Sequence, residues 1–267
     1  MSIEVMNLWE KVPGMCEETP VITAYIPENK KTDSAVVILP GGGYTWRAPH
    51  EGKGFAEFFN ENGICAFVVD YRVSPHRFPL PLLDSRRGIQ TVRYYADKYG
   101  IYKNKVLIMG SSAGGHLASL TSTYFEEIKD YDISDEISKE NFIPNGQILC
   151  YPVIALQGKD GDVHFGSGMN LLGEEYAQKS YEMSTQNIVS SKTPPAFIWH
   201  TFEDGVVNVK NSLDYAKALR DNGVLSEIHI YPQGHHGLGI PAPDSKLNIH
   251  VLQWTDQLIK WLEYMNF

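Results

Sequence analysis

Short apolar runs alternate with segments of helical periodicity from residue 35 to the end of the chain, and this order constrains the fold more than any other feature. Runs of this kind are typical of strands that are buried on both faces. Because successive parallel strands need crossover connections, the alternation predicts a mainly parallel, doubly wound α/β sheet with helices on both faces. We expect strands at residues 35–39, 64–69, 106–109, 147–153, 196–200 and 227–231, and helices at 54–62, 82–99, 113–125, 209–222 and 247–265.

One segment, residues 155–193, interrupts this alternation. It is rich in glycine and polar residues and contains one short helical stretch, near residues 170–179. An insertion of this kind beside a parallel sheet predicts a small lid or a substrate rim. No repeat, low-complexity tract or linker divides the chain, so we expect residues 1–267 to form a single domain.

Charge and cysteine content exclude several classes of protein. The 23 Lys and Arg residues face 32 Asp and Glu residues, a net charge of −9, so we expect no nucleic-acid partner. No apolar run approaches the ~18 residues of a membrane span, and the first residues do not form a secretory signal. We therefore expect a cytoplasmic protein without a membrane partner. The scattered residues Cys16, Cys65 and Cys150 favour free thiols, buried at Cys65 and Cys150, over a disulfide framework.

The third expected strand runs directly into Gly110-Ser111-Ser112-Ala113-Gly114-Gly115, and a helix follows. This segment fits the pattern G-x-S-x-G with Ser112 at its centre. A serine on a sharp strand-to-helix turn has strained backbone geometry, and flanking glycines remove side chains that would collide with it. The helix N-terminus adds partial positive charge where an oxyanion would form. We predict that Ser112 is a nucleophile and that the Ser111 side chain points away from the site.

A glycine loop, Pro40-Gly41-Gly42-Gly43-Tyr44, follows the first expected strand. It lies at the carboxyl end of a parallel strand, where α/β sheets bind ligands. We predict that the backbone amides of Gly42, Gly43 and Ala113 form an oxyanion hole, with the Tyr44 amide as the substitute donor. A phosphate-binding loop is disfavoured because the pattern G-x-x-x-x-G-K-[ST] is absent, whereas a plain flexible turn stays open.

A serine hydroxyl becomes nucleophilic when a histidine takes its proton and a carboxylate holds that histidine. On this kind of sheet the chain order is Ser, then Asp or Glu, then His. Glu203 and Asp204 follow the strand expected at 196–200, and we favour Asp204 because a turn into a helix comes next. His235 and His236 follow the strand expected at 227–231. We favour His236 because the glycine after it frees the backbone.

The other titratable residues have structural interpretations. The histidines at 116, 200 and 229 lie inside expected elements, which is typical of structural histidines. Asp70 is an alternative carboxylate, but it precedes the serine, and its place beside Tyr71-Arg72 indicates a structural ion pair. No group of His, Cys and Asp residues has the spacing of zinc ligands, so we expect neither a metal nor another cofactor.

Several side chains are candidates for substrate binding. Tyr44 and Trp46 are predicted to bind substrate, and Phe78 is a further candidate to shape an acyl pocket or to stack on a sugar. Positions in the core explain these aromatic residues equally well. His164, near the insertion, is favoured as a solvated loop histidine, with a place on the substrate rim as the alternative.

Taken in order, these segments resemble a known family. The matching segments are LPGGGY (39–44), HEG (50–52), DYR (70–72), GSSAGGHLA (110–118), YPVI (151–154), NLLG (170–173), PPAFIWHT (194–201) and HGLG (236–239). They are similar to the α/β-hydrolase esterases that include acetyl xylan esterases and related carbohydrate deacetylases. The resemblance runs from about Val36 to the end of the chain. It departs from the family at Pro40, where relatives carry the histidine of an H-G-G-G loop, and at His235, where a glycine is usual.

This resemblance implies an α/β-hydrolase fold and a serine carboxylesterase acting on small acyl esters, commonly the acetyl groups of xylo-oligosaccharides. By position it implies Ser112 as nucleophile, Asp204 as acid and His236 as base. The alternatives are another hydrolase on the same fold, such as an arylformamidase or a dipeptidyl-peptidase-like enzyme, a non-catalytic binding protein, and a scaffolding subunit. The complete set of Ser, Asp and His disfavours the binding protein, and no apolar stripe or repeat favours the scaffold.

Overall fold

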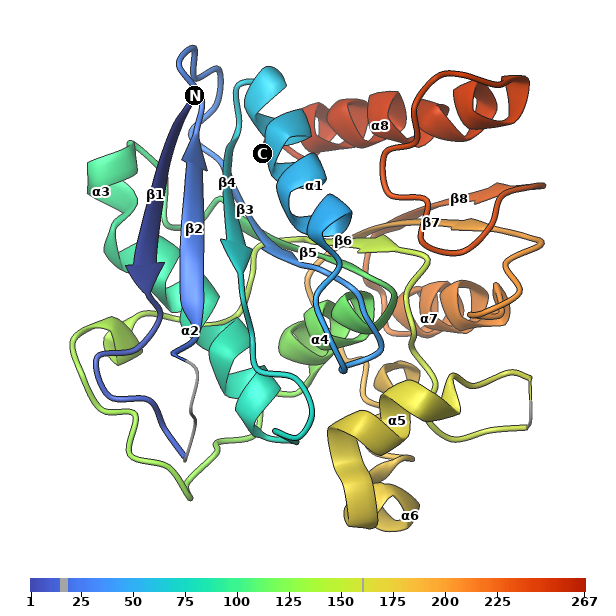
Figure 1. Ribbon diagram of the computed structural model, residues 1–267, viewed down its shortest axis with the longest axis horizontal. Helices are drawn as coiled ribbons and strands as arrows, with labels where there is room; N and C mark the ends of the chain where they lie inside the picture. The colour runs from blue at the N-terminus through green and yellow to red at the C-terminus, as the bar shows by residue number, and fades with distance from the viewer. Residues whose placement is uncertain (15–18, 160) are drawn as a thin grey trace.

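A computed structural model describes residues 1–14, 19–159 and 161–267 and contains one eight-stranded sheet (Figure 1). The strand order is β1-β2-β4-β3-β5-β6-β7-β8. The strands are β1 (Ser2–Asn7), β2 (Val21–Ile26), β3 (Ala35–Leu39), β4 (Cys65–Val69), β5 (Val106–Ser111), β6 (Gln147–Cys150), β7 (Ala196–Thr201) and β8 (Ser226–Tyr231). All pairs from β4 to β8 are parallel, which confirms the predicted sheet.

The first two strands were not predicted from the sequence. β1 pairs antiparallel with β2, and β2 pairs antiparallel with β4, so both extend one edge of the sheet. β1 is exposed along most of its length, and β2 buries only Ile22 and Ala24. Neither strand therefore has the continuous apolar run that marks the buried strands. Cys16 lies outside the described residues, whereas Cys65 and Cys150 are buried free thiols, as predicted.

Helices cover both faces of the sheet (Figure 1). On one face α2 (Leu80–Tyr94), α4 (Ser112–Thr123) and α7 (Lys210–Asp221) pack on the strands. On the other face lie α1 (Pro49–Glu61) and α8 (Lys246–Tyr264). Neighbouring strand residues divide between these two cores, because side chains along a strand alternate between faces.

The predicted helix at 82–99 is two helices in the structure. α2 ends at Tyr94, and the short α3 (Ala96–Tyr99) continues to Gly100, which has the left-handed conformation that ends a helix. On the opposite face the core contains a stacked pair of indole rings, Trp199 of β7 and Trp254 of α8. Their centroids lie 4.9 Å apart with 13° between the ring planes. This pair joins the C-terminal helix to β7, the strand next to the β8 edge of the sheet.

The inserted segment also differs from its predicted outline. Its first helix, α5 (Phe165–Leu172), starts earlier than expected, and the turn η2 (Gly173–Glu175) separates it from α6 (Tyr176–Lys179). Gly173 has φ +55°, a left-handed angle at which the helix ends, and a Cβ atom there would overlap the guanidinium group of Arg77, so only a glycine fits at this position. Two further short turns are η1 (Ile137–Lys139) and η3 (Thr185–Asn187). Within the described ranges, no helix combines the length and the apolar character needed to cross a bilayer.

Candidate active site

Ser112 lies where β5 ends and α4 begins, and its backbone is strained. Its φ is +52°, in the region that favours glycine, and the residue is only 6% exposed. The neighbouring glycines allow this turn. A Cβ atom on Gly110 would lie 2.1 Å from the Gly114 carbonyl oxygen, and one on Gly114 would lie 2.1 Å from the Leu39 carbonyl oxygen. A side chain at Gly110 would therefore push α4 away from β5, and one at Gly114 would push the turn away from the end of β3.

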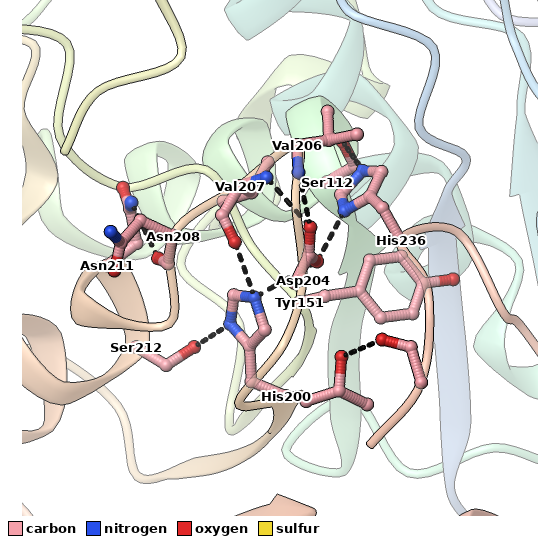
Figure 2. Close-up of polar contacts among 12 residues, drawn as sticks. Ser112, Tyr151, His200, Asp204, Val206, Val207, Asn208, Asn211, Ser212 and His236 are labelled. Carbon is pink, nitrogen blue, oxygen red and sulfur yellow. Dashed lines mark hydrogen bonds and ion pairs between the residues drawn. The ribbon is translucent and has the colours of Figure 1, made fainter. Parts of the chain in front are cut away.

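The structure brings Ser112, His236 and Asp204 into one hydrogen-bonded row (Figure 2). Ser112 Oγ lies 2.8 Å from His236 Nε2, and His236 Nδ1 lies 2.7 Å from Asp204 Oδ2. The neighbouring candidates are engaged elsewhere. Glu203 accepts a hydrogen bond from the Gly234 amide at 3.0 Å, and His235 is exposed with Nδ1 beside the His236 carbonyl. The row therefore contains Asp204 and not Glu203, and His236 and not His235, which are the residues that the sequence favoured.

The Asp204 side chain is fully buried and accepts four hydrogen bonds (Figure 2). Oδ1 accepts from the amides of Val206 and Val207, both at 2.9 Å, and Oδ2 accepts from His236 and, at 3.2 Å, from His200. Burial alone would raise the pKa of this carboxyl, but the hydrogen bonds from the two histidines outweigh burial and hold the pKa well below its usual range. The carboxylate therefore stays ionised and fixes the orientation of His236.

His200 contributes to the site in a way that the sequence did not predict. Its Nε2 faces both Asp204 and the Val207 carbonyl oxygen, 3.0 Å away, so this nitrogen carries the proton. Its Nδ1 lies 2.8 Å from Ser212 Oγ of α7. Its position near the end of β7, four residues before Asp204, was the available signal. A histidine inside a buried strand, however, is ordinarily structural, and only the fold shows which group it contacts.

The glycine loop borders the serine. A Cβ atom on Gly41 would lie 3.0 Å from the Ser112 Cβ, and the Gly41 amide donates to Glu51 Oε2 at 2.7 Å. Gly42 and Gly43 have φ values of +134° and +63°. Within the described part of the chain, their amides have no protein acceptor. Ala113 is the second residue of α4, where helix amides have no partner inside the helix.

The structure does not support the substrate-binding role predicted for the Tyr44 ring. Tyr44 is fully buried, and its hydroxyl lies 2.8 Å from His116 Nδ1, whose Nε2 in turn lies 2.8 Å from the Met183 carbonyl oxygen. The ring therefore has no free face for a sugar. Trp46, by contrast, is 55% exposed. Phe78 is partly buried and packs edge-on against Tyr124.

Helix α5 lies against the glycine loop. Asn170 Nδ2 donates to the Gly43 carbonyl oxygen and to Thr45 Oγ1, both at 2.8 Å. At the start of the same helix, His164 Nδ1 lies 2.8 Å from Ser167 Oγ. Burial lowers the pKa of this half-buried ring. His164 therefore lies at the start of α5 in the inserted segment with its Nδ1 engaged by Ser167, and is not a fully solvated loop histidine.

Asp70 forms an ion pair, although not with the adjacent arginine. Its Oδ1 lies 3.6 Å from Arg47 Nε, whereas Arg72 pairs with the fully buried Asp84 at 2.8 Å. Successive residues leave a strand end in different directions, so adjacency did not identify the partner. In the ranges that the structure covers, no three His, Cys, Asp or Glu side chains are arranged to hold a metal ion.

A mostly parallel sheet, a strained serine between strand and helix, and the chain order Ser, Asp, His together define an α/β hydrolase. Residues 22–219 match the family BD-FAE, and the chain belongs to this family. It is 38% identical over 82% of its length to an acetylxylan esterase of Xylanibacter ruminicola, and 34% identical over 88% of its length to endo-1,4-beta-xylanase B of Butyrivibrio fibrisolvens. The chain spans only 43% and 38% of these two relatives.

The structure is also similar to a crystal structure described as an acetyl ester-xyloside bifunctional hydrolase from Caldicellulosiruptor lactoaceticus. The TM-score is 0.89 at 40% sequence identity, and the match covers 99% of this chain and 97% of the other. The shared fold therefore includes the inserted segment as well as the sheet.

Proposed function

We propose that this protein is a serine carboxylesterase that removes short acyl groups, acetyl above all, from sugar esters such as acetylated xylo-oligosaccharides. The observation that supports this best is the row from Ser112 through His236 to Asp204, with distances of 2.8 and 2.7 Å. The names of the relatives from Xylanibacter and Caldicellulosiruptor support acetyl esters as the substrate class.

In the first half of the reaction, His236 takes the Ser112 proton at Nε2 while the serine oxygen attacks the ester carbonyl. Negative charge develops on the carbonyl oxygen, and the amides of Gly42, Gly43 and Ala113 are the proposed donors that stabilise it. The tetrahedral intermediate then collapses. The bond to the sugar oxygen breaks, the sugar leaves with the proton from His236, and an acyl-serine ester is left.

The second half repeats these steps with water as the nucleophile. His236 takes a proton from water, the hydroxide attacks the acyl-serine carbonyl, and collapse of the second intermediate releases the carboxylic acid. The proton returns to Ser112. Throughout, the ionised Asp204 stabilises the imidazolium form of His236 and keeps its Nε2 directed at the serine.

A groove beside the glycine loop offers a place for the part of the sugar that lies beyond the reacting ester. It has a volume of about 1250 Å³, and Pro40, Thr45, Trp46 and Asp70 are among the residues that line it, whereas Ser112, Asp204 and His236 do not. An exposed indole next to polar side chains suits a sugar, because the apolar face of a pyranose packs on an aromatic ring while its hydroxyls form hydrogen bonds. We therefore extend the proposal to Trp46 as the stacking surface for the sugar, and to the inserted segment as the rim of the site.

Hydrolysis of 4-nitrophenyl esters from C2 to C10, followed by acetate release from acetylated xylo-oligosaccharides, tests this function. We expect the highest kcat/KM at C2, and the Ser112→Ala variant should lose at least ~10³-fold in kcat. Trp46→Ala should raise KM for the oligosaccharide but not for 4-nitrophenyl acetate, with Tyr264→Ala, an exposed aromatic on α8, as the matched control.

Several results would contradict the proposal. Turnover of formyl-kynurenine without turnover of acetyl esters would select the arylformamidase alternative. Full activity of Ser112→Ala would exclude the serine mechanism.

The same panel should include a 4-nitrophenyl xyloside, because the relative from Caldicellulosiruptor is described as a bifunctional acetyl ester and xyloside hydrolase.

A further inference from the structure

Glu51 is a buried carboxylate that the reaction itself does not use. It is 2% exposed and lies in the first turn of α1, and both of its oxygens accept a hydrogen bond. Oε2 accepts from the Gly41 amide at 2.7 Å, and Oε1 accepts from the Tyr151 hydroxyl at 2.7 Å. A buried carboxylate is costly to keep unless it is well paired, so its position beneath the glycine loop calls for a reason.

Tyr151 extends this contact to the loop that carries the proposed base. Its hydroxyl donates to Glu51 and accepts from the Gly239 amide at 2.9 Å. Its ring packs edge-on against His236, with centroids 5.2 Å apart. The residue is 1% exposed and has φ +36°, an unfavourable angle for a tyrosine, so the surroundings hold it in place.

A second contact from the same turn of α1 reaches the histidine loop directly. His50 Nε2 lies 3.0 Å from the Gly237 carbonyl oxygen. The Ala48 amide, just before the helix, donates to the Gly41 carbonyl oxygen at 2.9 Å. The start of α1 therefore holds the glycine loop on one side and the histidine loop on the other, although these loops are far apart in sequence.

We propose that Glu51 and Tyr151 are positioning residues that fix the oxyanion-hole loop relative to His236. This inference rests on the esterase proposed above. The backbone of Gly41 is held at its N–H by Glu51 and at its carbonyl oxygen by the Ala48 amide. These two contacts set the direction of the Gly42 and Gly43 amides, which come next in the chain. Because catalysis needs the base and the oxyanion donors placed together within a fraction of an ångström, a rigid link between their loops acts on kcat more than on KM.

Glu51→Gln, Tyr151→Phe and the double variant test the link. In Glu51→Gln the single remaining oxygen can accept a hydrogen bond from either the Gly41 amide or the Tyr151 hydroxyl but not from both, so one of the two contacts is lost. In Tyr151→Phe the ring stays against His236 while the hydroxyl is removed. We expect each single variant to lose about 10- to 100-fold in kcat with KM within about threefold. The double variant should be no slower than the slower single variant, since the residues act as a unit. Glu57→Gln, on the exposed side of α1, is the matched control.

A second readout does not depend on turnover. The rate at which a fluorophosphonate labels Ser112 should fall in proportion to kcat, because phosphonylation needs the same oxyanion donors. If wild type labels but hydrolyses no ester, the esterase proposal fails and the labelling rates still test the link. A lowered melting temperature with wild-type kcat and labelling rate in the folded variants would show a structural role only and overturn the inference.

Discussion

Two residues of the site have backbone angles that most residues avoid. Ser112 has φ +52°, and Gly42 has φ +134°. Close packing keeps the Ser112 backbone in this conformation. Because Gly110 and Gly114 have no side chains, the backbones of β3, β5 and α4 can pack directly against one another around the turn. Strain of this kind costs of order 1–3 kcal/mol and persists only where the surroundings fix it. At Ser112 it directs the hydroxyl at His236.

The positions of Ser112, Asp204 and His236 could be predicted because each follows an expected strand, in the chain order that is typical of this kind of sheet. Glu51 and His200 could not be assigned in the same way. What they contact is fixed by tertiary packing that brings together residues far apart in sequence, as Glu51 and Tyr151 show with 100 residues between them. The Tyr44 ring failed as a prediction for a related reason, because its hydroxyl finds a partner, His116, in the core.

His116 makes the stability of the protein depend on pH. Burial lowers its pKa from 6.5 to about 4, so the folded protein binds fewer protons than the unfolded chain between these values. The contribution of His116 to stability is therefore fully present above pH 6.5 and is lost as the pH decreases toward 4. We expect His116→Gln to flatten the decrease in the free energy of unfolding over this range by its own share, on the order of 3 kcal/mol.

Denaturant titrations at several pH values between 4 and 7 measure this effect. His250→Gln, at an exposed histidine on α8, is the control and should leave the slope unchanged. Equal slopes in wild type and His116→Gln would show that other groups cause the acid sensitivity.

The helices and buried strands were predictable as elements because each has a strong periodic signal. The boundaries were less so, and the edge strands β1 and β2 were missed because an exposed strand has no continuous apolar run. The inserted helix divides at Gly173, whose φ is +55°, and the packing of Arg77 against this glycine could not be read from the local sequence.

The glycine loop and helix α1 give opposite predictions for the same substitution. In Gly42→Ala the new Cβ would lie 2.2 Å from the Trp46 carbonyl oxygen, at a φ that favours glycine. We expect a loss of about 1–3 kcal/mol in the free energy of unfolding and a lower kcat.

In Gly54→Ala, inside α1, the Cβ would meet nothing within 4 Å, so we expect a gain of about 0.5–1 kcal/mol in the free energy of unfolding.

Urea titrations of the two variants and wild type, with ester turnover measured on the same samples, check both signs. If Gly42→Ala changed neither the free energy of unfolding nor kcat, the loop could move without cost, which would argue against a rigid, preformed oxyanion hole.

For the whole molecule, a buried ion pair joins the N-terminal segment to the main sheet. Arg72 pairs with Asp84 of α2, at side-chain exposures of 3% and 0%, and it also donates to the Pro13 carbonyl oxygen. The Trp9 indole donates to the same Asp84 at 2.7 Å. Removal of one partner leaves the other charge buried and unpaired, so Asp84→Ala should cost about 3–5 kcal/mol.

Guanidinium titration measures this loss. Asp214→Ala, which removes an exposed partner of Lys210 on α7, is the control and should change the free energy of unfolding by less than about 1 kcal/mol. A loss of similar size in both variants would mean that burial of the Arg72 charge is unimportant.

The stacked indoles of Trp199 and Trp254 also give the molecule an optical signature. We expect two indoles whose centroids lie 4.9 Å apart to couple their excited states and to split their shared absorption band. One indole belongs to β7 and the other to α8, so the splitting should be present only while that helix is docked. Ultraviolet circular dichroism can therefore follow detachment of the carboxyl-terminal helix separately from loss of helix content.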